Sequence, residues 1–172
     1  MGPTLEEALH VVVERRRDRA RRHGQEFEEP TWAPCTSAEI DELVSLARSK
    51  IDIEVPPDYL SLLKLTRRFG TQWGCLFDPG DFLEENFKQW CTKTTVLSST
   101  NEFRVSVQSR FATDRERVQP TFALLGQNSN QASFVYRYAT KLYEITGFSF
   151  REHVYESFPS LAALINHIGR EG

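Results

Sequence analysis

Cysteine and histidine are the side chains here with the most versatile chemistry, so their spacing is the first test for an active site. Cys35, Cys75 and Cys91 occur singly, and the four histidines form no HxxxH or HExxH pattern. A nucleophilic Cys75 or Cys91 would need a base such as His153 beside it, and no local spacing indicates that pair. Odd, unpaired cysteines are typical of a reducing compartment and predict neither a disulfide framework nor a metal site.

Paired carboxylates are the other common source of catalysis, and the candidates are Glu84 and Glu85. Neighbouring residues on a helix do not face one another, so the two are poorly placed to work as acid and base. The chain also lacks a Walker loop, a GxGxxG turn and a GxSxG elbow. We therefore expect a protein that is not an enzyme, with no catalytic residue, cofactor or metal ligand.

The acidic stretch around these two glutamates, residues 78–90, is better suited to binding another protein, because its carboxylates alternate with large aromatic residues such as Phe87. Aromatic anchors inside a charged rim are typical of interface hot spots. A solvated acidic side of an amphipathic helix explains the pattern equally well, and both interpretations stay open. The residues predicted to bind a partner are Trp73, Asp78, Asp81, Phe82, Glu84, Glu85, Trp90, Asn128 and Asn130.

Three members of that set have a simpler structural explanation. Trp73 fits core or pocket lining better than an exposed anchor, because aromatic side chains usually serve packing. Asn128 and Asn130 stand at a predicted loop tip, where turn formation alone accounts for them.

An arginine cluster dominates residues 14–23, which carry six arginines against two acids and a net charge of about +4. The whole chain has a net charge of −3, so the remainder carries about −7 and is distinctly acidic. The cluster is a candidate nucleic-acid contact. Arginines near a helix C-terminus also complement its dipole, and no aromatic residues are interleaved for base stacking, so we favour a structural role.

The 172 residues predict one domain over 1–172, with a helix and connector at 1–34 and the main body at 36–172. No window approaches the roughly 18 apolar residues of a membrane span. The first residues do not resemble a secretory signal. We therefore expect a cytoplasmic protein without a membrane partner.

Capping boxes at Thr4–Glu7 and Thr36–Glu39 predict two amphipathic helices, the first ending near Gly24. A third helix is predicted from Pro57 to a terminator at Gly70. A short strand at 73–77, a turn at 78–81 and a helix at 82–90 follow. Residues 93–97 resemble a strand, whereas 99–111 fit a helix better than a strand.

The C-terminal half predicts a strand at 121–125 that ends at Gly126, and then a hairpin of 133–138 with 142–145. A last helix should follow Ser160, with one apolar face. The predicted fold is α+β: N-terminal helices pack on a mostly antiparallel sheet, and a C-terminal helix closes it.

Three segments carry a family resemblance: "VPPDYLSLLKLTRRFGTQWGCLF", "FALLGQNSNQASFVYRYATKLYEI" and "YESFPSLAALINHI". Together they resemble the SUKH superfamily of Smi/Knr-like domains, most closely its YrhA-like bacterial immunity proteins. The resemblance covers most of residues 40–168, with 78–120 matching poorly. The family's frequent Asn-Gly at the helix end is replaced here by Phe69 and Gly70.

The resemblance implies a binding module. Bacterial members of the superfamily are typically immunity proteins that neutralise a cognate secreted toxin, delivered by type VI or contact-dependent secretion and often acting on nucleic acid. The expected partner is such a toxin with a basic active-site cleft, toward which an acidic protein is steered. A regulatory scaffold of the same fold is the alternative, and no oligomeric state is predicted.

Overall fold

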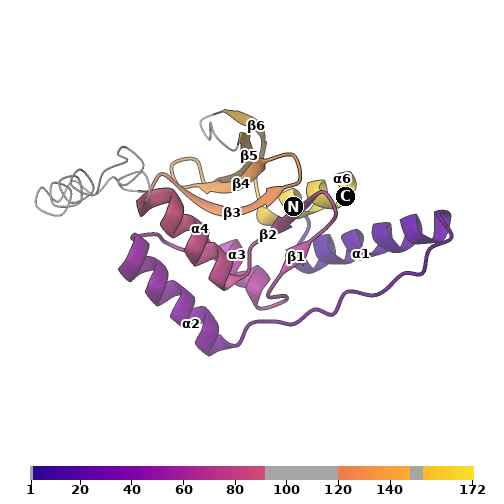
Figure 1. The fold of residues 1–172 in the computed structure, drawn as a ribbon, viewed down its shortest axis with the longest axis horizontal. Helices are drawn as coiled ribbons and strands as arrows, with labels where there is room; N and C mark the ends of the chain where they lie inside the picture. Colours follow the sequence, from indigo (N-terminus) through magenta and orange to yellow (C-terminus); the bar gives the residue numbers. More distant parts are fainter. Residues whose placement is uncertain (1, 92–119, 148–152) are drawn as a thin grey trace, which may run out of the picture.

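The computed structural model describes residues 2–91, 120–147 and 153–172 (Figure 1). The predicted segments 93–97 and 99–111 lie outside these residues. The helices are α1 (Leu5–Arg22), α2 (Ser37–Leu46), the π-helical turn η1 (Ala47–Ile51), α3 (Pro57–Leu63), α4 (Pro79–Cys91) and α6 (Leu161–Glu171). The strands are β1 (Phe69–Gly70), β2 (Gly74–Leu76), β3 (Phe122–Asn128), β4 (Ala132–Arg137), β5 (Leu142–Gly147) and β6 (Val154–Phe158).

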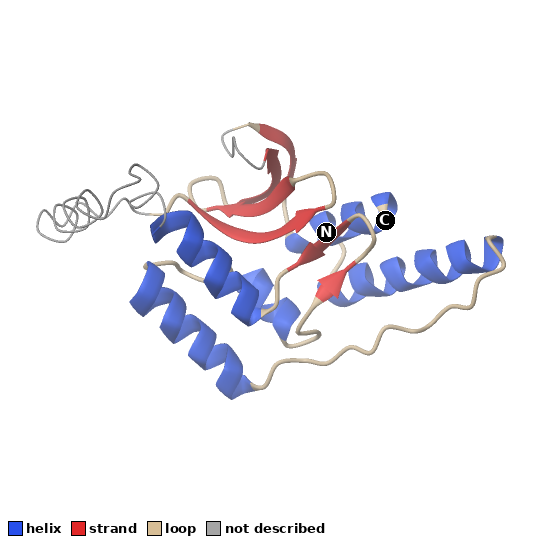
Figure 2. Cartoon of the chain, in the orientation of Figure 1, coloured by secondary structure: helices blue, strands red, loops and turns tan. Residues whose placement is uncertain are grey.

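The described residues form an α+β fold around one six-stranded antiparallel sheet in the order β1-β2-β3-β4-β5-β6. The helices gather on one side of this curved sheet (Figures 1 and 2). The predicted hairpin is confirmed as β4 and β5, with Tyr136 opposite Tyr143. The predicted fold class is therefore confirmed, including the N-terminal helices and the closing helix α6.

Both predicted capping boxes are present. The Thr4 hydroxyl accepts a hydrogen bond from the Glu7 amide at 3.2 Å, and the Glu7 carboxylate accepts one from the Thr4 amide at 2.7 Å. Thr36 and Glu39 make the same pair of bonds at the start of α2. Gly24, which follows α1, has a φ of 63°, a backbone conformation that glycine adopts without strain.

The third helix is shorter than predicted. Pro57 occupies its first position as expected, but α3 ends at Leu63. The hydroxyl of the buried Thr66 then donates to the Arg68 carbonyl at 2.8 Å, which stabilises a turn away from the helix axis. Gly70 consequently lies in β1, so the prediction that it terminates the helix is wrong.

Two strands also differ from the prediction. β3 continues through Gly126 to Asn128, because β2 pairs with it there. β6 was not predicted. Its first four residues are exposed and only Phe158 is buried, so it has little of the alternating pattern that marks a strand.

The core lies between the sheet and the helices. The apolar face predicted for the last helix is confirmed, since Leu164, Ile165 and Ile168 are fully buried in α6. α1 packs on α6 at Gly169, where an added Cβ would stand 2.4 Å from Val12 Cγ2. Within the described residues, no helix combines the length and the hydropathy that crossing a membrane requires.

Candidate functional site

The predicted partner-binding stretch begins with the first turn of α4. Asp78 precedes the helix, and its Oδ1 accepts a hydrogen bond from the Asp81 amide at 2.9 Å. Pro79 takes the first helical position, where its missing N–H costs nothing. Residues 78–81 are therefore a capped helix start, and the prediction of a separate turn is wrong.

The carboxylates at this helix start share one arginine. Arg68 lies 2.7 Å from Asp78 Oδ2 and 3.2 Å from Asp81 Oδ2. Partial burial favours the neutral form of Asp78. That effect is outweighed by hydrogen bonds from the Asp81 amide, the Arg68 guanidinium and the Gly80 amide, so the pKa of Asp78 is lowered. The ion pair between Arg68 and Asp78 is partly exposed, so its contribution to the stability of the fold is modest.

Replacing Asp78 by asparagine should show this interaction as a pH dependence. Asparagine caps a helix as well as aspartate does, but it cannot form the ion pair. Because the pKa of Asp78 in the folded state lies below the ordinary aspartate value of 3.8, the charged carboxylate stabilises the fold above about pH 4, and this stabilisation is lost as the pH falls further. In urea unfolding we expect Asp78→Asn to cost up to about 1 kcal/mol at pH 7. The difference should shrink toward pH 3, and a pH-independent difference would contradict this account.

The exposed side of α4 continues with Glu84 and Glu85, which lie 2.6 and 2.9 Å from Lys88 Nζ. Their carboxylates raise the pKa of Lys88. Phe87 stands beside them and is 50% exposed, an unusual position for a large apolar side chain. An exposed aromatic residue among carboxylates is the arrangement that the sequence predicted, although Phe87 was not in the predicted binding set.

Helix α2 adds carboxylates whose positions in the sequence do not connect them with this site. It packs against α4 (Figure 1), and its Asp41 and Glu42 are exposed. Among the residues that the structure describes, no ion pair engages either of them. We call the exposed and partly exposed acids of α2 and α4, together with the exposed Phe87 of α4, the acidic helix pair. Its members are Asp41, Glu42, Asp81, Glu84, Glu85 and Phe87.

Two predicted aromatic anchors of α4 point inward. Phe82 is fully buried and stacks on Tyr59, with ring centroids 5.0 Å apart. Trp90 is partly buried, with its ring 4.9 Å from that of Phe122. Phe82 cannot touch a partner from this position, so its place in the predicted binding set is wrong. The helical period explains this position, because Phe82 and Asn86 stand four residues apart and share the buried face of α4.

Asn86 fixes α4 to the sheet and thereby presents the acidic helix pair. It is fully buried, and its amide donates to the Leu124 carbonyl and accepts from the Leu124 amide, both at 2.8 Å. β2 pairs with β3 only from Gly126 to Asn128, so no strand lies beside Leu124 on that side. The Asn86 side chain takes the place of the missing strand. No sequence signal marked Asn86, which directly follows Glu84 and Glu85.

Trp73, Asn128 and Asn130 form a second group at the other end of β2. Trp73 packs on Phe134 at 5.7 Å, and its carbonyl accepts from the Ser129 amide. Asn128 Oδ1 accepts from the amides of Asn130 and Ala132 at 3.0 and 2.7 Å. These contacts support the core and turn interpretations given above, so the acidic helix pair is the better candidate site.

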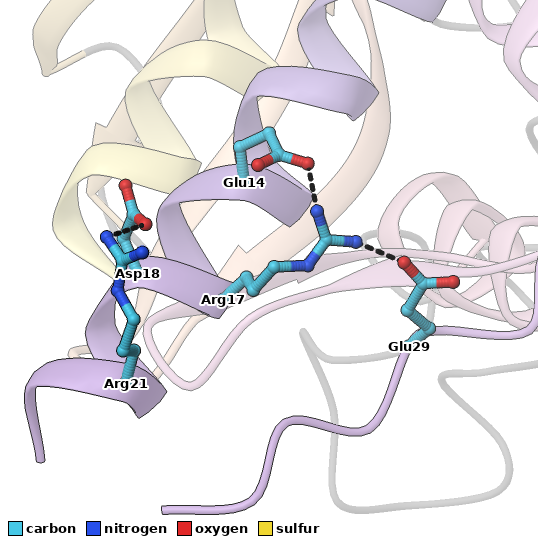
Figure 3. A network of polar contacts seen from close by, with 5 residues as sticks. All are labelled: Glu14, Arg17, Asp18, Arg21 and Glu29. Atoms are coloured by element: carbon cyan, nitrogen blue, oxygen red, sulfur yellow. Dashed lines mark hydrogen bonds and ion pairs between the residues drawn. The ribbon is translucent and has the colours of Figure 1, made fainter. Parts of the chain in front are cut away.

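Most of the arginine cluster on α1 has partners within the chain, and Figure 3 shows those of Arg17 and Arg21. Arg17 forms ion pairs with both Glu14 and Glu29, and Arg21 lies 3.0 Å from Asp18. The Arg15 side chain donates to the Asn166 carbonyl in α6 at 3.1 Å. These contacts favour the structural role of the cluster over a nucleic-acid contact.

The cysteines form no recognisable reactive centre in the described part of the chain. Cys35 is buried, which raises the pKa of its thiol, and Cys75 is half-buried in β2. No group of three or more histidine, cysteine, aspartate or glutamate side chains among the described residues is placed to hold a metal ion.

The acidic helix pair has to be interpreted from its own geometry. No protein-family model matches the chain, and neither the curated proteins nor the solved structures include a match to it.

Proposed function

We propose that this protein is a SUKH-like immunity protein that neutralises a cognate secreted toxin by binding it through the acidic helix pair. The supporting observation is an exposed, carboxylate-rich surface with Phe87 as an apolar anchor. A toxin that acts on nucleic acid needs a basic cleft, and complementary charge speeds the encounter with such a cleft. The family resemblance described above supports the same function.

The most direct test is growth rescue. A toxin gene lying beside the gene for this protein is expressed in a sensitive host, with and without this protein. We expect growth only when both are present, and a stable complex of the two on gel filtration. Continued killing in the presence of the soluble, folded protein contradicts the proposal for that toxin.

Charge reversal on α4 should locate the interface. The double variant Glu84→Lys, Glu85→Lys places like charges against the basic cleft, and we expect its affinity for the toxin to fall by at least about tenfold. Its stability should change little, since both ion pairs with Lys88 are exposed. Calorimetric titration measures the affinity, and rescue measures the consequence.

A matched control keeps the overall charge equal. Glu26→Lys, Glu28→Lys makes the same charge change on the exposed connector between α1 and α2. Only the α4 variant should lose affinity. If both variants weaken binding equally, net charge rather than this surface drives the interaction, and the assignment of the acidic helix pair is wrong.

A further inference from the structure

A groove of about 490 Å³ lies between α1 and the connector that leads to α2. Its apolar lining includes Leu9 and Val13 of α1, Trp32 of the connector and Leu65. A groove of this volume, with an aromatic side chain and a few polar groups, has the dimensions of a small-molecule site. The acidic helix pair involves none of these residues, and of the four only Leu65 lies in a segment that carries the family resemblance.

The connector is held in place at both ends of the groove. Near α1, Arg17 pairs with Glu29 and its guanidinium lies 5.4 Å from the centroid of the Phe27 ring. Near α2, the Cys35 amide donates to the Leu63 carbonyl at 2.8 Å. The groove therefore has a fixed wall, which limits the entropy that a ligand must remove on binding.

The charges that line the groove select for a cation. Arg17 lies between Glu14 and Glu29 (Figure 3), so these three side chains carry one net negative charge. Glu6 also lines the groove and adds a second negative charge. In the described residues Glu6 has no ion-pair partner, so its carboxylate is available to a ligand. The groove already holds one guanidinium between two carboxylates, which shows the chemistry that it accommodates.

We propose that this groove binds a small organic cation, a primary ammonium group on an apolar body. The apolar part lies against Trp32, Leu9 and Val13, and the ammonium group lies toward Glu6 at the rim. The apolar lining removes the apolar body from water, and a carboxylate forms charge-assisted hydrogen bonds with an ammonium group, so both parts of the lining favour the same ligand. This inference does not depend on the proposed immunity function.

Tryptamine and indole-3-acetate provide the test, because they share the indole ring and differ in charge. Each is titrated into the full-length ¹⁵N-labelled protein, and amide chemical shifts are followed by NMR. We expect tryptamine to shift amides in residues 6–17 and 29–32 in a saturable manner. Indole-3-acetate should cause no saturable shift there. Equal binding of both compounds, shifts confined to other parts of the protein, or no shift with tryptamine overturns the proposal.

The variant Glu6→Gln tests the role of the Glu6 charge in ligand binding without disturbing the fold. Glu6→Gln should weaken tryptamine binding by roughly tenfold, as expected for one charged hydrogen bond. It leaves the ion pairs of Arg17 unchanged. Glu26→Gln is the matched control on the connector outside the groove lining, and its affinity should equal that of the wild type. Unchanged affinity in Glu6→Gln overturns the role of that carboxylate, and equal loss in both variants overturns the site.

Discussion

Replacing Asn86 by alanine is expected to lower the free energy of unfolding by about 3 kcal/mol, because two buried backbone groups lose their partners. The Asn86 amide makes three hydrogen bonds of 2.8 Å, one to the Phe82 carbonyl of its own helix and two to the backbone of Leu124. Alanine removes all three and leaves a cavity beside Leu124, whose side chain is itself buried.

The expected loss of stability in Asn86→Ala follows from the position of Leu124 in the sheet. On one side β3 pairs with β4, and on the other side β2 reaches only from Gly126 to Asn128. The Asn86 amide supplies a donor and an acceptor with the polarity of a peptide group, so Leu124 is paired on its open side. Without it, the Leu124 amide and carbonyl face a helix that has no groups to offer them.

Urea unfolding followed by circular dichroism measures the change, and Asn130→Ala is the matched control. Asn130 is exposed at the turn after β3, so its substitution should change stability by no more than about 0.5 kcal/mol. We also expect Asn86→Ala to weaken toxin binding, since α4 carries four of the six residues of the acidic helix pair. A loss below about 1 kcal/mol for Asn86→Ala would contradict the role of this side chain.

Local signals made the helix starts predictable. Thr4 and Thr36 begin helices because their capping boxes satisfy amide groups within four residues of sequence, without help from the rest of the chain. The hairpin of β4 and β5 was predictable for a similar reason, since its alternating apolar residues and short turn lie together. Ser160 caps α6 in the same local manner.

The errors arose where distant contacts decide the structure. Gly70 has the composition of a helix terminator, but pairing with Cys75 places it in a strand. Phe82 resembled an exposed anchor among acids, and only its stacking on Tyr59 shows that it belongs to the core. Asn86 gave no signal at all, because a buried asparagine and a surface asparagine look alike in a sequence.

The candidate site was predicted in part. The carboxylates of α4 were identified from their spacing, and the structure leaves Glu84 and Glu85 on its exposed side. Asp41 and Glu42 were missed because they lie more than 35 residues away in the sequence, and only the packing of α2 on α4 brings their helix beside the predicted stretch. The groove beside Trp32 was missed for the same reason, since its walls come from two segments.

Replacing Gly126 by alanine should be as damaging as the loss of Asn86, with an expected cost of about 3 kcal/mol. An added Cβ would lie 2.1 Å from the Cys75 carbonyl oxygen and 3.0 Å from Leu76 Cα. Both are backbone atoms of β2, so no side chain can rotate to make room, and the pairing of β2 with β3 must open.

Gly80→Ala is the matched control for this variant, because the two substitutions add the same methyl group. Gly80 lies exposed in the first turn of α4, where the nearest atom to an added Cβ is Asp78 Oδ1 at 3.4 Å. Alanine there should leave stability unchanged or raise it by up to about 1 kcal/mol, since glycine loses more chain entropy in a helix. Thermal and urea unfolding of both variants measure the contrast. Equal stability of Gly126→Ala and the wild type would show that β2 and β3 do not approach as closely as the structure requires.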